Sequence, residues 1–102
     1  MVATTGAAIF PIGNMPTPPR ILPAPVRVKS ASDLGAVVRS VRKALKLDQA
    51  TGAGLAGVGV RFLGDVERGK PTVRLGLALQ VLDRLGLEVW IGPRGSGPGG
   101  AR

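Results

Sequence analysis

The chain has 102 residues, a formal net charge of +8 at pH 7, and neither cysteine nor histidine. Disulfide frameworks, the usual zinc sites and general-base catalysis by histidine are therefore excluded. No apolar run reaches the roughly 18 residues that a membrane-spanning helix needs. The apolar run from Met1 to Phe10 lacks a basic start and meets Pro11 at once, so we do not interpret it as a signal peptide.

The composition divides the chain into a core and two tails. Six of the nine prolines lie in residues 1–29, and five of the 16 glycines lie in residues 92–102. We expect a proline-rich disordered tail over 1–29, one folded domain over 30–91 and a glycine-rich disordered tail over 92–102. All six acidic residues fall within the domain, so the tails carry only basic charge. Such tails suit a polyanionic partner, although the same charge would also aid solubility.

The first helix is expected to begin after Ser30, which suits an N-cap, with Asp33 near the positive end of the helix dipole. A helical stripe of apolar residues follows, made of Leu34, Val37, Val38, Val41 and Leu45. Ahead of this helix, residues 26–28 alternate as Val-Arg-Val and form either a very short strand or the end of the tail.

The next two helices are short, and glycines separate them. Asp48 suits the N-cap of a helix over 49–56, and Gly57 follows where a helix end needs a left-handed residue. A third helix is expected over about 60–68, before Gly69, with an inward face made of Phe62, Leu63 and Val66. Two short helices joined by a glycine-containing turn are typical of a helix-turn-helix.

After Pro71, Thr72 is expected to cap a fourth helix over about 73–85. A stripe facing one core would consist of Leu75, Ala78, Leu79, Leu82 and Leu85, which leaves Leu77 and Val81 on a second face. The composition of residues 87–91 predicts a strand that would pair with the same strand of another subunit. The expected fold is all-α: a four-to-five-helix bundle with a short C-terminal β-strand for dimer pairing.

An ordered series of short motifs runs from about Val28 to Ile91. It consists of Leu34-Gly35, Val38-Arg39, Arg42-Lys43-Ala44, Leu47-Asp48-Gln49, Leu55-Ala56-Gly57-Val58, Arg61-Phe62-Leu63, Glu67-Arg68-Gly69-Lys70-Pro71-Thr72 and Val81-Leu82-Asp83-Arg84-Leu85-Gly86-Leu87. In this order the motifs resemble the Xre/Cro helix-turn-helix family, and within it the branch of HipB-like antitoxins. The resemblance implies a lambda-repressor-like bundle, and it covers neither tail.

The resemblance also implies a set of DNA contacts. Gln49 occupies the place of a glutamine that touches the DNA backbone. On the third helix, Arg61 is the best base reader, or binds phosphate instead, while Val60 suits a thymine methyl. Arg68 and Lys70 are expected to clamp phosphates, or else form a solvated basic helix end. The whole DNA-binding set is Gln49, Gly59, Val60, Arg61, Gly64, Asp65, Arg68 and Lys70.

Two further features follow from the comparison with this family. Arg42 and Glu67 stand where similar proteins have a partly buried, structural ion pair. Gly52 stands where leucine is usual, and Gly59 where serine or threonine is usual. Because each interior helical glycine costs about 1 kcal/mol relative to alanine, we expect the reader unit to be loose in isolation.

The implied function is that of a sequence-specific DNA-binding regulator that represses its own gene, cytoplasmic and associated with the nucleoid. A homodimer would read a palindromic operator in double-stranded DNA with half-sites about 34 Å apart. Its dimer contacts would come from Leu77, Val81, Leu87, Val89, Trp90 and Ile91.

The resemblance further implies the antitoxin of a type II toxin–antitoxin pair. The alternative is a protein-interaction module that neutralises a HipA-like kinase toxin, with weak or lost DNA binding. No cofactor, metal or enzymatic activity is expected, because the six scattered acids offer no nucleophile–base or metal-binding constellation.

Overall fold

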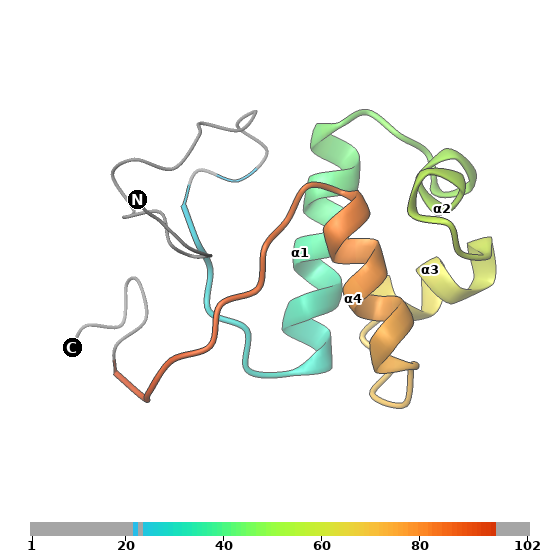
Figure 1. Ribbon diagram of the computed structural model, residues 1–102. Coiled ribbons are helices and arrows are strands. Elements are labelled where there is room, and N and C mark those ends of the chain that lie inside the picture. The colour runs from blue at the N-terminus through green and yellow to red at the C-terminus, as the bar shows by residue number, and fades with distance from the viewer. Residues whose placement is uncertain (1–21, 23, 96–102) are drawn as a thin grey trace, which may run out of the picture.

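The computed structural model describes Leu22 and residues 24–95, and all regular structure in this part of the chain is helical (Figure 1). The helices are α1 (Ala31–Ala44), α2 (Gln49–Ala56), α3 (Val60–Glu67) and α4 (Leu75–Arg84). The predicted all-helical bundle with two short central helices is confirmed. The predictions for residues 1–21, 23 and 96–102, which make up most of both tails, lie outside the described residues.

Side-chain caps fix the starts of α1 and α2, as the sequence predicts. The Ser30 hydroxyl accepts a hydrogen bond from the Asp33 backbone N–H at 3.1 Å, and the Asp33 carboxylate accepts one from the Lys29 N–H at 2.9 Å. The Asp48 carboxylate accepts a bond from the Thr51 N–H at 2.7 Å, which holds the pKa of Asp48 below its usual value. These bonds satisfy N–H groups that a helix start leaves without partners.

Glycines in the left-handed conformation end α2 and the turn after α3. Gly57, the C-cap of α2, has φ of +75°, and Gly69 has φ of +80°. The helix α3 ends at Glu67, one residue earlier than predicted. Gly69 also lies against the start of α1, since a Cβ built on it would stand 2.7 Å from the Ser32 Cα. The turn after α3 therefore requires glycine for both its dihedral angle and its close packing.

The fourth helix starts later than predicted, and Thr72 is not its cap. Residues 71–73 form a turn, and Arg74 occupies the N-cap position without a side-chain capping bond. Arg74 is in the extended region, with φ of −68° and ψ of 120°. The residues that the spacing assigned to the first turn of the fourth helix thus form the non-helical turn after Pro71 instead.

The helices pack around one apolar core. The helix α3 packs on both α1 and α2, and α4 packs on α2. The core residues are Val38, Val41, Ala53, Ala56, Leu63, Val66, Ala78, Val81, Leu82 and Leu85. The helix-turn-helix unit is therefore held between two other helices rather than standing free.

The helix α4 turns a different face to the core from the one predicted. Val81 is fully buried, whereas Leu75 is 68% exposed and Leu79 is 44% exposed. Ala78, Val81, Leu82 and Leu85 also follow helical spacing, so spacing alone does not choose between the two stripes. The prediction that Val81 makes dimer contacts is therefore wrong, because its side chain is already covered by its own chain.

The strand predicted at residues 87–91 is not formed in the part of the chain that the structure describes, and residues 26–28 follow the second of their two alternatives, without regular structure. Residues 87–91 carry no regular structure after the turn at Gly86, where φ is +87°. A strand exists through its hydrogen-bonded neighbour, and a single chain supplies none to this segment. The strand that the sequence predicts for pairing with a second subunit is therefore not seen in the single chain, and for the dimer it stays a prediction.

The crossing of α1 and α3 depends on Gly35. A Cβ built on Gly35 would stand 2.3 Å from the Val66 carbonyl oxygen and 2.8 Å from that of Glu67. Both contacts are with backbone, so no change of rotamer would relieve them. Only a residue without a side chain permits this approach.

Gly35→Ala should therefore destabilise the domain by roughly 1–3 kcal/mol, because the two helices must separate to admit one methyl group. Gly54→Ala is the matched control: it lies inside α2, no atom is within 4 Å of its built Cβ, and the change should stabilise by about 1 kcal/mol. Thermal and urea unfolding of both variants measure the difference. Equal stability of the two variants would contradict the proposed close contact.

Candidate nucleic-acid interface

A buried ion pair joins α1 to the end of α3. Arg42 Nε lies 2.6 Å from Glu67 Oε2, and Arg42 Nη2 donates to Glu67 Oε1 at 2.9 Å. The two side chains are 9% and 4% exposed. Arg42 Nη1 also donates to the Leu47 carbonyl at 2.7 Å, in the connection between α1 and α2. The structure thus brings together the two residues that the sequence analysis pairs, in bidentate geometry.

Gly52 makes room for this pair rather than leaving a hole in the core. A Cβ built on Gly52 would stand 2.9 Å from Arg42 Cδ and 3.4 Å from Leu63 Cδ2. The aliphatic stem of Arg42 therefore occupies the space beside α2 where a larger side chain would have to lie. The expectation that Gly52 loosens α2 by removing a core side chain is not supported by this packing.

Gln49 belongs to the same polar cluster. Its Nε2 donates to Glu67 Oε1 at 3.1 Å, which fastens the first residue of α2 to the last residue of α3. Burial of Glu67 alone would raise its pKa, but the hydrogen bonds from Arg42 and Gln49 outweigh burial and lower it. The bond to Glu67 also raises the pKa of Arg42. Both groups are therefore held in their charged forms.

The exposed face of α3 begins with Val60 and Arg61. Leu63 and Val66 are buried and Phe62 is half-buried, whereas Val60 and Arg61 are exposed. Among the described residues, Arg61 makes no hydrogen bond or ion pair. Gly59, the N-cap, offers no side-chain bond, and its built Cβ would meet no atom within 4 Å. The start of α3 is thus open, and its arginine is available to a ligand.

The C-terminal half of the same face forms a charged cluster. The Asp65 carboxylate is paired with the Arg68 guanidinium and lies 3.7 Å from Lys70 Nζ. Gly64 is buried, and its built Cβ would stand 3.1 Å from Arg68 Nη1. The sequence analysis expected Gly64 to contact DNA. In the structure Arg68 lies over Gly64, so Gly64 is not directly accessible to a ligand.

A relative shows what kind of protein carries this unit. The chain is 52% identical, over 63 residues, to the uncharacterized HTH-type transcriptional regulator y4mF of Sinorhizobium fredii. The matched region is 62% of this chain and 83% of the relative. This chain belongs to the HTH-type transcriptional regulators. No protein-family model matches it.

The helix-turn-helix prediction is thus confirmed for this regulator at the level of the family, and α2 and α3 are the two short helices that its geometry requires. The sequence analysis missed one residue that positions them. Gln80 of α4 donates its amide to the Ala56 carbonyl at 2.8 Å and to that of Gly57 at 3.4 Å. This bond caps the C-terminal end of α2 from a distant helix. The one available signal was a polar residue next to the buried Val81.

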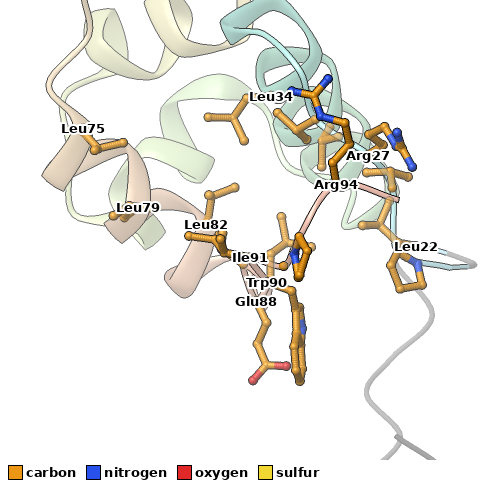
Figure 2. A pocket seen from close by; sticks show the side chains of 18 of the residues that line it. Leu22, Arg27, Leu34, Leu75, Leu79, Leu82, Glu88, Trp90, Ile91 and Arg94 are labelled. Atoms are coloured by element: carbon orange, nitrogen blue, oxygen red, sulfur yellow. The ribbon is translucent and has the colours of Figure 1, made fainter. Parts of the chain in front are cut away.

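An apolar groove of about 580 Å³ is lined by α1, α4 and the chain segments before α1 and after α4 (Figure 2). In Figure 2, Leu75, Leu79 and Leu82 of α4 form one side, Leu22 and Arg27 the other, and Trp90 and Ile91 lie between them. Of the predicted dimer residues, Leu77 and Leu87 are half-buried, and the exposed ones are Val89, Trp90 and Ile91. The groove therefore combines part of the predicted dimer surface with Leu75 and Leu79, which were assigned to the core.

Two further classes of site are absent from the described part of the regulator. No helix there is long and apolar enough to cross a membrane. The same residues include no group of three or more histidine, cysteine, aspartate or glutamate side chains that would hold a metal ion.

The stability of the regulator should fall in acid because of Glu67. Its folded pKa lies below the ordinary 4.5, so the carboxylate stabilises the fold fully above about pH 4.5 and loses this effect as pH falls through the lower, folded value. Urea unfolding over a pH series should therefore show a steep acid limb. Glu67→Gln should make that limb shallower, whereas Glu88→Gln, at an exposed site, should leave it unchanged. An unaltered limb in Glu67→Gln would contradict this assignment.

Proposed function

We propose that the regulator binds a specific site in double-stranded DNA through α3 and represses its own promoter. The observation that carries this proposal is the exposed, unpaired Arg61 next to Val60 at the open start of α3. An arginine fork matches the O6 and N7 acceptors of guanine, and an aliphatic side chain suits a thymine methyl group. Because α3 is held by the Arg42–Glu67 pair, its exposed face is a preorganised surface.

Contacts with the DNA phosphate backbone would fix the position of α3 along the duplex. Gln49 lies at the first turn of α2, where N–H groups point outward, and its amide is oriented by Glu67. The N–H groups at the start of α3 follow Gly59, which supplies no side-chain acceptor, so they remain suited to a phosphate. Lys70 adds a cation beyond the end of α3. Together, these groups position the helix without reading sequence.

The regulator would bind DNA as a homodimer that reads a palindrome with half-sites about 34 Å apart. The apolar groove supports this part of the proposal, because it carries exposed apolar side chains on α4 and on residues 87–91. Burial of such side chains in a second subunit removes apolar area from water. The segment 87–91 would also gain the strand partner that the single chain does not provide.

The motif resemblance supports a place in the Xre/Cro family and its HipB-like branch, and with it a role as the antitoxin of a type II pair. The alternative is a module that neutralises a HipA-like kinase toxin and binds DNA weakly. The groove favours a protein partner of some kind in either case. Co-expression with the product of a neighbouring reading frame, followed by a kinase assay, separates the two. Neutralisation of the kinase by a wild-type protein that does not bind its own upstream region would favour the alternative.

The DNA-binding proposal predicts the effect of one arginine. Arg61→Ala should weaken binding to the gene's own upstream region by roughly 1–3 kcal/mol, because a bidentate base contact is lost. Arg94→Ala removes the same charge at the groove, as the matched control, and should change binding little. Fluorescence anisotropy over a salt series measures both. The proposal would be overturned if the wild-type affinity did not change with salt concentration, or if the Arg61→Ala variant bound DNA as tightly as the wild type.

The dimer proposal predicts the effect of charge in the groove. The double variant Leu75→Asp/Leu79→Asp should sediment as a monomer, since charges without partners would be buried in the interface. Both side chains are exposed in the single chain, so the fold should persist. Leu55→Asp, at an exposed leucine of α2 outside the groove, should remain dimeric. Dimers of the double variant, or wild-type monomers at all concentrations, would contradict the proposed interface.

A further inference from the structure

The exposed face of α3 extends beyond the last helical residue. Arg61, Gly64, Asp65 and Arg68 follow one another at intervals of three, one and three residues, so they share one face. Helical side chains lean towards the N-terminus, so Arg68, the C-cap, reaches back over the preceding turn. Its guanidinium therefore lies about one turn closer to Arg61 than the position of its Cα suggests.

One hydrogen bond and the open space above Gly64 define the place of this guanidinium. Arg68 Nη2 donates to Asp65 Oδ1, and Arg68 Nη1 would stand 3.1 Å from a Cβ built on Gly64. The Asp65 side chain is 19% exposed and its second oxygen lies 3.7 Å from Lys70 Nζ. The Arg68 side chain nevertheless remains 69% exposed. The group is thus held on one edge and open to a ligand on the other.

We propose that Arg68 is a second base-reading residue, with Asp65 as the residue that positions it and Gly64 as the place where its guanidinium lies. This proposal rests on the proposed function, because it requires that α3 enters the major groove. Arg61 and Arg68 would then present two guanidinium groups along one face, each suited to the O6 and N7 acceptors of a guanine. The recognised half-site would contain a guanine for each of them.

The charge of Asp65 favours base reading over a phosphate clamp. A clamp requires only a cation within reach, and a carboxylate beside it repels the DNA backbone and lowers affinity. A base reader requires orientation, because a guanidinium has five N–H donors in a rigid fork. The hydrogen bond to Asp65 uses one donor, and the side chain stays 69% exposed, so the other donors remain accessible to a base. Asp65 therefore lowers the affinity of the protein for DNA of any sequence and increases its selectivity for one sequence.

Gly64 makes this arrangement testable without disturbing the fold. An alanine Cβ at this position would meet the far end of a flexible side chain rather than backbone. Gly64→Ala should therefore keep or raise the melting temperature, since alanine favours a helix. It should also push the Arg68 guanidinium out of place. A variant that is at least as stable and less selective separates a reading role from a structural one.

The experiment uses the full chain and a random-duplex selection to obtain the preferred site. Affinity is then measured for the selected duplex and for a scrambled duplex of the same composition. Arg68→Lys keeps the charge but loses the fork, so its preference for the selected duplex should fall roughly 5- to 150-fold, while affinity for the scrambled duplex stays unchanged. Asp65→Asn should bind the scrambled duplex more tightly and discriminate less. Lys70→Ala, the matched control, should weaken both duplexes equally.

Two results distinguish the possible failures. Preference unchanged in Arg68→Lys, together with equal loss on both duplexes in Arg68→Ala, would assign Arg68 to phosphate contact and overturn this inference alone. Wild-type protein that binds neither duplex would overturn the proposed function and this inference with it. The sites that Arg68→Lys selects should keep the guanine that depends on Arg61 and lose the preference for a second guanine beside it. This result would support the assignment.

Discussion

The buried pair of Arg42 and Glu67 is the interaction on which the geometry of the helix-turn-helix depends. Glu67 is the last residue of α3, Gln49 is the first residue of α2, and the Leu47 carbonyl belongs to the connection that follows α1. All three meet at the Arg42 guanidinium or its partner. The loss of one member of such a pair strands a buried charge, at a cost of roughly 3–5 kcal/mol. The relative placement of α1, α2 and α3 is therefore fixed by polar contacts as well as by the apolar core.

The glycines of this unit have different effects, and the structure separates them. Gly35 lets α3 approach α1 as far as its carbonyl oxygens, and Gly52 leaves the space that the Arg42 stem fills. Gly54 faces open space and carries only the entropic cost of a helical glycine. A high glycine content thus does not make the unit uniformly loose. At two positions it allows the close packing that brings the ion pair and the helix crossing together.

Local sequence signals predicted the helix-turn-helix well, and non-local contacts account for most of the errors. Ser30, Asp48 and Gly57 act within a few residues of themselves, so the starts of α1 and α2 and the end of α2 follow from the sequence. The buried face of α4 depends on where α2 lies, and two stripes satisfied its spacing until Val81 was found in the core. The Gln80 cap on α2 and the Arg68–Asp65 pair are tertiary or conformer-dependent contacts, and single-residue patterns do not specify them. The strand predicted at 87–91 also depends on a non-local contact, since a strand needs a hydrogen-bonded partner and the single chain supplies none to this segment.

The regulator separates its two surfaces of opposite character, and α1 and α4 connect them. In Figure 1, α3 lies on one side of α1 and α4, and the chain segments before α1 and after α4 lie on the other. No residue of α3 lines the groove, so a protein partner in the groove would not compete with DNA for the same residues. Leu82 belongs to both the core and the lining of the groove, and Gln80 on the same helix caps α2. A partner bound in the groove would therefore contact the same helix that caps the end of α2 and packs in its core.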